Sequence, residues 1–264
     1  MKRSFLFFSL LYSLYGCSGF IYRGSMNQFY LKKKQFSWKK LPTRDFILYY
    51  RPDSKTEKNL PLVEQKITQG ITKAKKITKI DSLKIPIHYF IVNDRKEFTS
   101  LTRLNHTGIS YSQSNTIIES YPLLGEAHEV VHLITHQNWG NSRTWIMEGI
   151  AVYSDDNWNG KTLEKTCFEL CRNEQLIPLK ELIKDSKFTR FNSQISYPQS
   201  GLLIKYLIQT YGWEQFLKFW KNPDIKKIYN LTVSQLELDW INSVKKYNSE
   251  TQLHLNNFHH ILLI

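Results

Sequence analysis

The sequence predicts an α+β fold, with a small mixed sheet in its first half and mainly helices in its second half. Short runs of aromatic and β-branched residues, bounded by turn residues, occur at 45–50, 85–92 and 116–119. Beyond residue 122, apolar residues recur at helical spacing instead. A chain in which strands come first and helices later is typical of an α+β domain.

Two helices are expected among these strands. Residues 61–79 carry apolar side chains at the spacing of an amphipathic helix, which turns its lysines outward. Asp94 is suited to cap a short helix over residues 95–102. The strand at 116–119 is short and follows a polar turn, so we expect it at an edge of the sheet.

The second half is expected to be helical throughout. Pro122 suits the first turn of a helix that runs to about Gln137 and stops before Gly140. A second helix is expected to start near Ser142 or Thr144. Further helices are predicted near residues 161–171, 178–184, 198–210, 213–220 and 232–246.

The composition favours a folded, basic protein. Hydrophobic residues make up 41% of the 264 residues and charged residues 22%, which argues against bulk disorder. The net charge of +13 is compatible with nucleic acid, an anionic membrane surface or acidic substrates. We favour a solvated, lysine-rich surface, and no nucleic-acid partner is expected because no binding motif accompanies the charge. The oligomeric state stays open.

The N-terminal stretch predicts export and lipid attachment. Lys2 and Arg3 precede an apolar run from Phe5 to Gly16, which is too short to span a bilayer as a mature helix. The sequence Leu-Tyr-Gly-Cys at 14–17 resembles the lipobox of bacterial lipoproteins. The resemblance implies cleavage before Cys17, lipid on its thiol and a membrane-anchored protein of the bacterial cell envelope.

Four segments follow from this interpretation. Residues 1–16 are expected to be a lipoprotein signal peptide and residues 17–43 a lipidated tether. Residues 44–250 are expected to form the folded domain, and the role of the tail at 251–264 is open. Cys167 and Cys171 could form a disulfide in an exported protein or remain two buried thiols, and they lack the further ligands of a zinc site.

The sequence His-Glu-Val-Val-His at 128–132 carries the chemistry of a metal site. His128 and His132 are four residues apart, so one face of a helix presents both imidazoles to a single metal. Glu129 is about 100° further round the helix, where it can reach a water molecule activated by the metal without being a ligand. It would then act as the general base.

A third ligand must come from another element, because a zinc site that catalyses hydrolysis uses three protein ligands and keeps one position open. Glu148 lies on the next predicted helix, which a tight connection at 138–143 would fold back onto the first. His136 is the rival. It is one helical turn beyond His132 and cannot close on the metal held by the first pair, so we expect it to support the ligands from outside or to be structural.

His-Glu-Val-Val-His followed by Trp-Ile-Met-Glu-Gly-Ile-Ala at 145–151 resembles the gluzincin metallopeptidases, especially the bacterial peptidase-MA-like group. The resemblance implies a zincin-like fold, in which the small N-terminal mixed sheet is followed by the active-site helix and a mainly helical C-terminal half. It also implies Zn²⁺ bound by His128, His132 and Glu148, with Glu129 as the general base. The expected activity is hydrolysis of a peptide or protein substrate by metal-activated water.

Two motifs of related families are missing. No Gly-x-Met-Glu-Asn sequence precedes the metal helix, which argues against aminopeptidase activity. Val152 stands where thermolysin-like enzymes carry an acidic residue. Asp155 could replace that acid, although we expect it to be a surface charge.

Two further roles are hypotheses from position alone. Tyr197, just before a predicted helix, is the candidate to stabilise the oxyanion, with a packing role as the alternative. The strand at 116–119 could pair with an extended peptide and lay it across the metal. Two other functions stay open: a catalytically silent zincin-fold lipoprotein that acts as a binding or assembly factor in the cell envelope, and a basic surface protein that binds anionic polymer or lipid.

Overall fold

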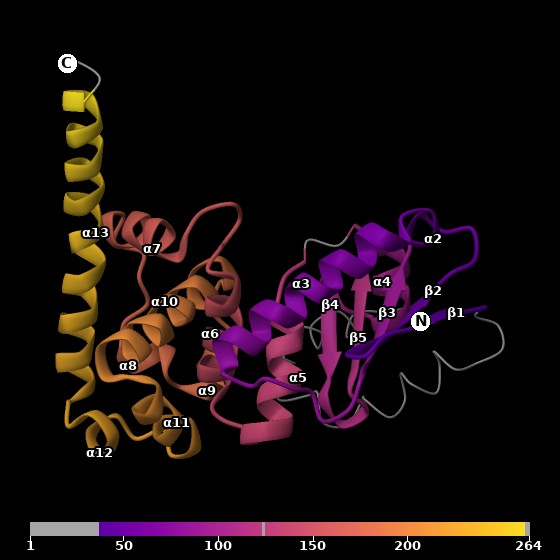
Figure 1. Ribbon diagram of the computed structural model, residues 1–264. Coiled ribbons are helices and arrows are strands. Elements are labelled where there is room, and N and C mark those ends of the chain that lie inside the picture. Colours follow the sequence, from indigo (N-terminus) through magenta and orange to yellow (C-terminus); the bar gives the residue numbers. More distant parts are fainter. Residues whose placement is uncertain (1–36, 123–124, 262–264) are drawn as a thin grey trace, which may run out of the picture.

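The computed structural model describes residues 37–122 and 125–261, with side chains described as far as residue 247. Cys17 and the rest of the expected signal peptide lie outside these residues, as does most of the expected tether. Within the described residues, no helix is both long and apolar enough to cross a membrane. Figure 1 shows the sheet at one side of the molecule and helices α7 to α13 at the other, with α5 and α6 between them.

The sheet has five strands in the order β1-β2-β3-β5-β4. The three central strands, β2 (Phe46–Tyr50), β3 (Ile87–Val92) and β5 (Thr116–Ser120), run parallel to one another. The outer strands β1 (Lys39–Pro42) and β4 (Gly108–Tyr111) pair antiparallel with their neighbours. The sheet is therefore mixed, as the sequence predicts.

Two expectations about strands are wrong. Lys39–Pro42 pairs with β2, so the folded domain includes residues that we expected in the tether. The strand predicted at 116–119 is β5, which lies between β3 and β4 rather than at an edge. Its side chains are almost all buried, because apolar clusters cover both faces of the sheet at this strand. Within the described residues the edge strand on this side is β4, which the sequence analysis does not predict.

Alternation along the strands divides the sheet into two apolar faces. Leu48, Tyr89 and Ile117 lie opposite one another across the three parallel strands and belong to the main core. Phe90 and Val92 point to the other face, where they pack with Phe98 of α4 (Arg95–Thr102). The main core continues from the sheet through α3 (Leu60–Thr78) into the helical half.

The helices agree with most of the predicted segments. Asp94 caps α4 by accepting a hydrogen bond from the Glu97 amide, as expected. The remaining elements are α2 (Lys55–Lys58), η2 (Ser112–Ser114), α5 (His128–Trp139), α6 (Thr144–Asp155), α7 (Leu163–Arg172), α8 (Leu179–Leu182), α9 (Asp185–Phe188), α10 (Ser193–Tyr211), α11 (Trp213–Lys221), α12 (Ile225–Tyr229) and α13 (Val233–Ile261).

Two helix boundaries differ from the prediction. Helix α5 begins at His128, not at Pro122. Pro122 follows a cis peptide bond after Tyr121, and Gly125 has a φ of 75°, which a right-handed helix does not accommodate. Helix α13 continues past residue 250 to Ile261, so most of the expected tail prolongs the last helix.

Candidate metal centre

Helix α5 places two imidazoles side by side at its N-terminal end. The Nε2 atoms of His128 and His132 are 3.2 Å apart, as their spacing of one helical turn predicts. The opposite face of α5 is apolar and buried, with Val131, Leu133 and Ile134 in the main core. The two histidines are therefore fixed by the burial of the other side of their own helix.

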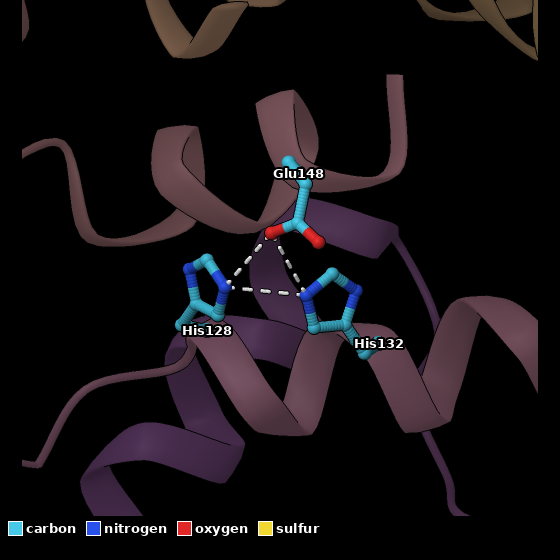
Figure 2. Close-up of side chains that lie close together, drawn as sticks. All are labelled: His128, His132 and Glu148. Carbon is cyan, nitrogen blue, oxygen red and sulfur yellow. Dashed lines mark hydrogen bonds and ion pairs between the residues drawn. The ribbon is translucent and has the colours of Figure 1, made fainter. Parts of the chain in front are cut away.

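Helix α6 brings a carboxylate to this pair. Gly140, with a φ of 76°, ends α5, and a short connection leads to Thr144 at the start of α6. Oε2 of Glu148 then lies 3.3 Å from His128 Nε2 and 3.4 Å from His132 Nε2. Figure 2 shows the three side chains converging from the two facing helices.

The three atoms fit a zinc ion. Within the described part of the chain, this is the one group of three metal-ligating side chains whose donor atoms converge. Ligand atoms at zinc distances of about 2.0–2.1 Å, arranged as a tetrahedron, are roughly 3.3 Å from one another. The observed separations of 3.2, 3.3 and 3.4 Å match those edges. Three corners of a tetrahedron are thus provided by protein, the number of protein ligands that hydrolytic zinc sites use.

The charges in the site are matched. The side chain of Glu148 is only 3% exposed. Burial alone would raise its pKa, but the charge of His132 and the hydrogen bonds with both histidines hold that pKa well below its usual range. Burial alone would lower the pKa of His128, but the hydrogen bond with Glu148 and the charge of Glu129 raise it to about 9. The site therefore favours an ionised carboxylate facing positive charge.

Close packing of α10 against α6 fixes Glu148 from behind. A Cβ atom on Gly149 would lie 2.9 Å from the carbonyl oxygen of Ser200 and 2.6 Å from a carbon of Ile204. Trp145, one turn before Gly149, is buried against Phe219 of α11. The glycine and the tryptophan of the Trp-x-x-Glu-Gly-x-Ala sequence thus have packing roles that place the glutamate between them.

Glu129 lies between α5 and the edge strand β4. A Cβ atom on Gly108 of β4 would come within 3.4 Å of Glu129 Cγ. Gly108 therefore leaves room for the Glu129 side chain beside the exposed edge of the sheet. The side chain of Glu129 therefore lies against β4.

A second carboxyl group next to Glu129 was missed by sequence reasoning. Glu119 of β5 also borders Gly108, at 3.1 Å from the same Cβ position. Burial raises the pKa of Glu119 to about 8, the charge of Glu129 adds to the rise, and a hydrogen bond from Tyr89 opposes it. The sequence signal for Glu119 was a charged residue at the end of the strand Thr-Ile-Ile-Glu. Its proximity to Glu129 could not be inferred without the strand order.

Asp155 is not the surface charge that we expected. Its side chain is 11% exposed, and Oδ1 accepts a hydrogen bond of 2.7 Å from the backbone amide of Ala127. The ammonium group of Lys73 on α3 is 3.7 Å from the same oxygen. Burial raises the pKa of Asp155, and the amide and the charges of His128 and Lys73 oppose that rise.

The other candidate residues are not members of this cluster. His136 pairs through Nδ1 with Asn141 at 2.9 Å and is not part of the cluster, as the spacing argument predicts. Tyr197 lies on α10 with its ring near those of Trp158 and Phe188, and its role toward an oxyanion stays a prediction. Cys167 and Cys171 are free thiols.

One comparison with known proteins identifies a family for this chain. A family model described as the Peptidase MA superfamily matches residues 66–246, which include His128, His132 and Glu148. Among solved structures, a mutant of an M1 zinc metallopeptidase from Deinococcus radiodurans aligns with 80% of this chain at 11% identity and a TM-score of 0.45. Native yeast LTA4 hydrolase aligns with 80% at 14% identity and a TM-score of 0.44.

This chain spans only part of either solved structure, covering 51% of the first and 37% of the second. No curated protein sequence matches the chain significantly.

Proposed function

Because the chain belongs to the Peptidase MA superfamily, we propose that it is a zinc-dependent peptidase that hydrolyses peptide bonds of peptide or protein substrates. The observation that carries the proposal is the triangle formed by His128, His132 and Glu148, whose edges match those of a zinc tetrahedron. A zinc ion held there would supply Lewis-acid chemistry, acidifying water and polarising a carbonyl group.

Glu129 performs the proton transfers in this proposal. Its carboxylate takes a proton from the attacking water as the new carbon–oxygen bond forms, and it returns the proton to the leaving amine nitrogen as the carbon–nitrogen bond breaks. Glu129 lies about 100° round α5 from His128, so it is not on the helix face that carries the two histidines. It is therefore free to transfer protons while His128 and His132 hold the metal. Tyr197 remains the candidate to donate a hydrogen bond to the oxyanion.

The substrate is proposed to lie along β4. Within the described sheet, β4 is an edge strand, with β5 on one side only. An extended peptide that adds to this edge gains backbone hydrogen bonds without any requirement for particular side chains. Gly108, near Glu129, would then bring the peptide backbone close to the general base. This replaces the strand at 116–119 that the sequence had suggested for the same role.

The proposal is tested by cleavage of a mixed peptide library with the purified protein. Cleavage should disappear when zinc is removed by a chelator and return when zinc is added in stoichiometric amount. Products identified by mass spectrometry would also separate internal cleavage from removal of terminal residues. Cleavage that survives complete zinc removal would contradict the proposal.

We also propose that the protein is anchored by lipid on Cys17 and faces the bacterial cell envelope. The support is the resemblance of residues 14–17 to a lipobox. Labelling of cells with a tagged fatty acid should mark the wild-type protein and not Cys17→Ser, although Cys167 and Cys171 remain in both. Equal labelling of the two would contradict the anchor and would leave the peptidase proposal unaffected.

A further inference from the structure

The two helices that carry the metal ligands lack N-terminal caps of their own. Neither Ala127, before α5, nor Arg143, before α6, provides a side-chain hydrogen bond to its helix. Helices α3, α8, α9 and α11 also lack a side-chain cap. Six other helices are capped by the side chain at their own N-cap position: Ser54, Asp94, Thr162, Asn192, Asp224 and Thr232. The first turns of α5 and α6 therefore depend on residues from elsewhere to satisfy free amide groups.

Aspartates from later elements provide these missing caps. Asp155, the last residue of α6, accepts a hydrogen bond from the Ala127 amide at the start of α5. Asp185, at the start of α9, accepts one of 2.9 Å from the Thr144 amide at the start of α6. A cap supplied by another element does more than satisfy an amide, because it also fixes the position of one element relative to the other.

Asp155 joins the two ligand helices directly. It lies seven residues after Glu148 on α6, and the amide that it binds is one residue before His128 and two before Glu129. Its negative charge at the N-terminus of α5 is also favourable toward the helix dipole. Lys73 of α3 pairs with the same oxygen, but its side chain is 50% exposed, so this ion pair is expected to contribute little.

We propose that Asp155 is a positioning residue for the metal centre. By holding the first turn of α5 against the end of α6, it keeps His128 and Glu129 in register with Glu148. The inference rests on the metal site of the proposed function. It adds that the geometry of the three ligands depends on a hydrogen bond outside the ligand set, which is how residues that orient metal ligands generally act.

The test measures the zinc affinity of the full chain by competition with a chromophoric chelator at fixed pH. Asp155→Ala removes the acceptor, and we expect its zinc affinity to fall by about tenfold or more. Asp155→Asn keeps an oxygen that can accept from the Ala127 amide, so its affinity should stay within about threefold of wild type. Lys73→Ala should leave the affinity unchanged.

Asp94→Ala is the matched control. Asp94 also caps a helix, accepting from the Glu97 amide at 2.8 Å, but α4 packs on the other face of the sheet. This variant should lose stability without losing zinc affinity. An equal loss of affinity in Asp94→Ala would show that any loosened helix weakens the site, and would overturn the inference.

Three further results decide the matter. Wild-type affinity in Asp155→Ala would overturn the inference while leaving the proposed function intact. A tenfold loss of zinc affinity in Asp155→Asn would overturn the capping role. This result decides the matter even if Asp155→Ala does not fold. Failure of the wild-type chain to bind zinc would overturn the proposed function, and the inference with it.

Discussion

Gly149 and Ser200 are in contact across the interface between α6 and α10, and the contact leaves no room for a side chain at Gly149. A Cβ atom there would lie 2.9 Å from the Ser200 carbonyl oxygen and 2.6 Å from Ile204. Gly149 follows Glu148 directly, so the close approach of α10 to α6 also fixes the position of the Glu148 carboxylate.

Gly149→Ala is therefore expected to destabilise the fold by about 1–3 kcal/mol, as overpacked core substitutions do. The measurement is the free energy of unfolding from denaturant titration. The sign of the change in the free energy of unfolding distinguishes the two cases, because alanine in place of a helical glycine without close neighbours would stabilise the protein by about 1 kcal/mol. A variant more stable than wild type would contradict the packing described here.

Zinc binding is expected to depend on the three residues of the cluster and not on His136 of the same helix. His132→Ala and Glu148→Gln should each weaken zinc binding by at least about a hundredfold, since each removes a direct ligand from a site of three. His136→Ala is the control on the same helix, because His136 pairs with Asn141 outside the cluster. It should bind one zinc ion as tightly as wild type. Loss of zinc from the His136 variant would redefine the ligand set.

Glu119 predicts a dependence of stability on pH. Its pKa is raised to about 8 in the folded protein, from an ordinary value of 4.5, chiefly by burial. The unfolded chain therefore releases this proton first, and the stability that the protonated group contributes is complete below pH 4.5 and lost as the pH rises to about 8.

Replacing Glu119 by Gln removes this titration while keeping the shape and an acceptor for Tyr89. Relative to wild type, Glu119→Gln should gain stability between pH 5 and 8, by an amount on the order of 1 kcal/mol or more, since one pKa unit corresponds to about 1.4 kcal/mol. Thermal unfolding of both proteins across this pH range measures the difference. Parallel profiles for the two proteins would contradict the raised pKa.

The convergence of His128, His132 and Glu148 was predictable from the sequence because it follows local rules. Helical spacing alone places His128 and His132 on one face, and the short connection to the next helix brings Glu148 to them. Most helices were predicted for the same reason, since their apolar periodicity lies within one segment. The separation of His136 from the cluster followed from the same geometry.

The features that were missed depend on tertiary arrangement. The position of β5 inside the sheet follows from the strand order, which no local pattern encodes. The proximity of Glu119 to Glu129 depends on that strand order. The capping of α5 by Asp155 depends on the packing of α6 on α5. Helix α5 starts later than Pro122 because Gly125, with a φ of 75°, cannot belong to a right-handed helix.

In the proposed function, Glu129 transfers protons in a zinc-dependent hydrolysis. The most direct measurement compares wild type with Glu129→Gln on the same peptide library, with the zinc content of each protein determined in parallel. Both proteins should hold one zinc ion, because Glu129 is not a ligand, and the variant should cleave at least about a hundredfold more slowly, as expected for loss of a general base. Equal cleavage by two proteins of equal zinc content would contradict the account.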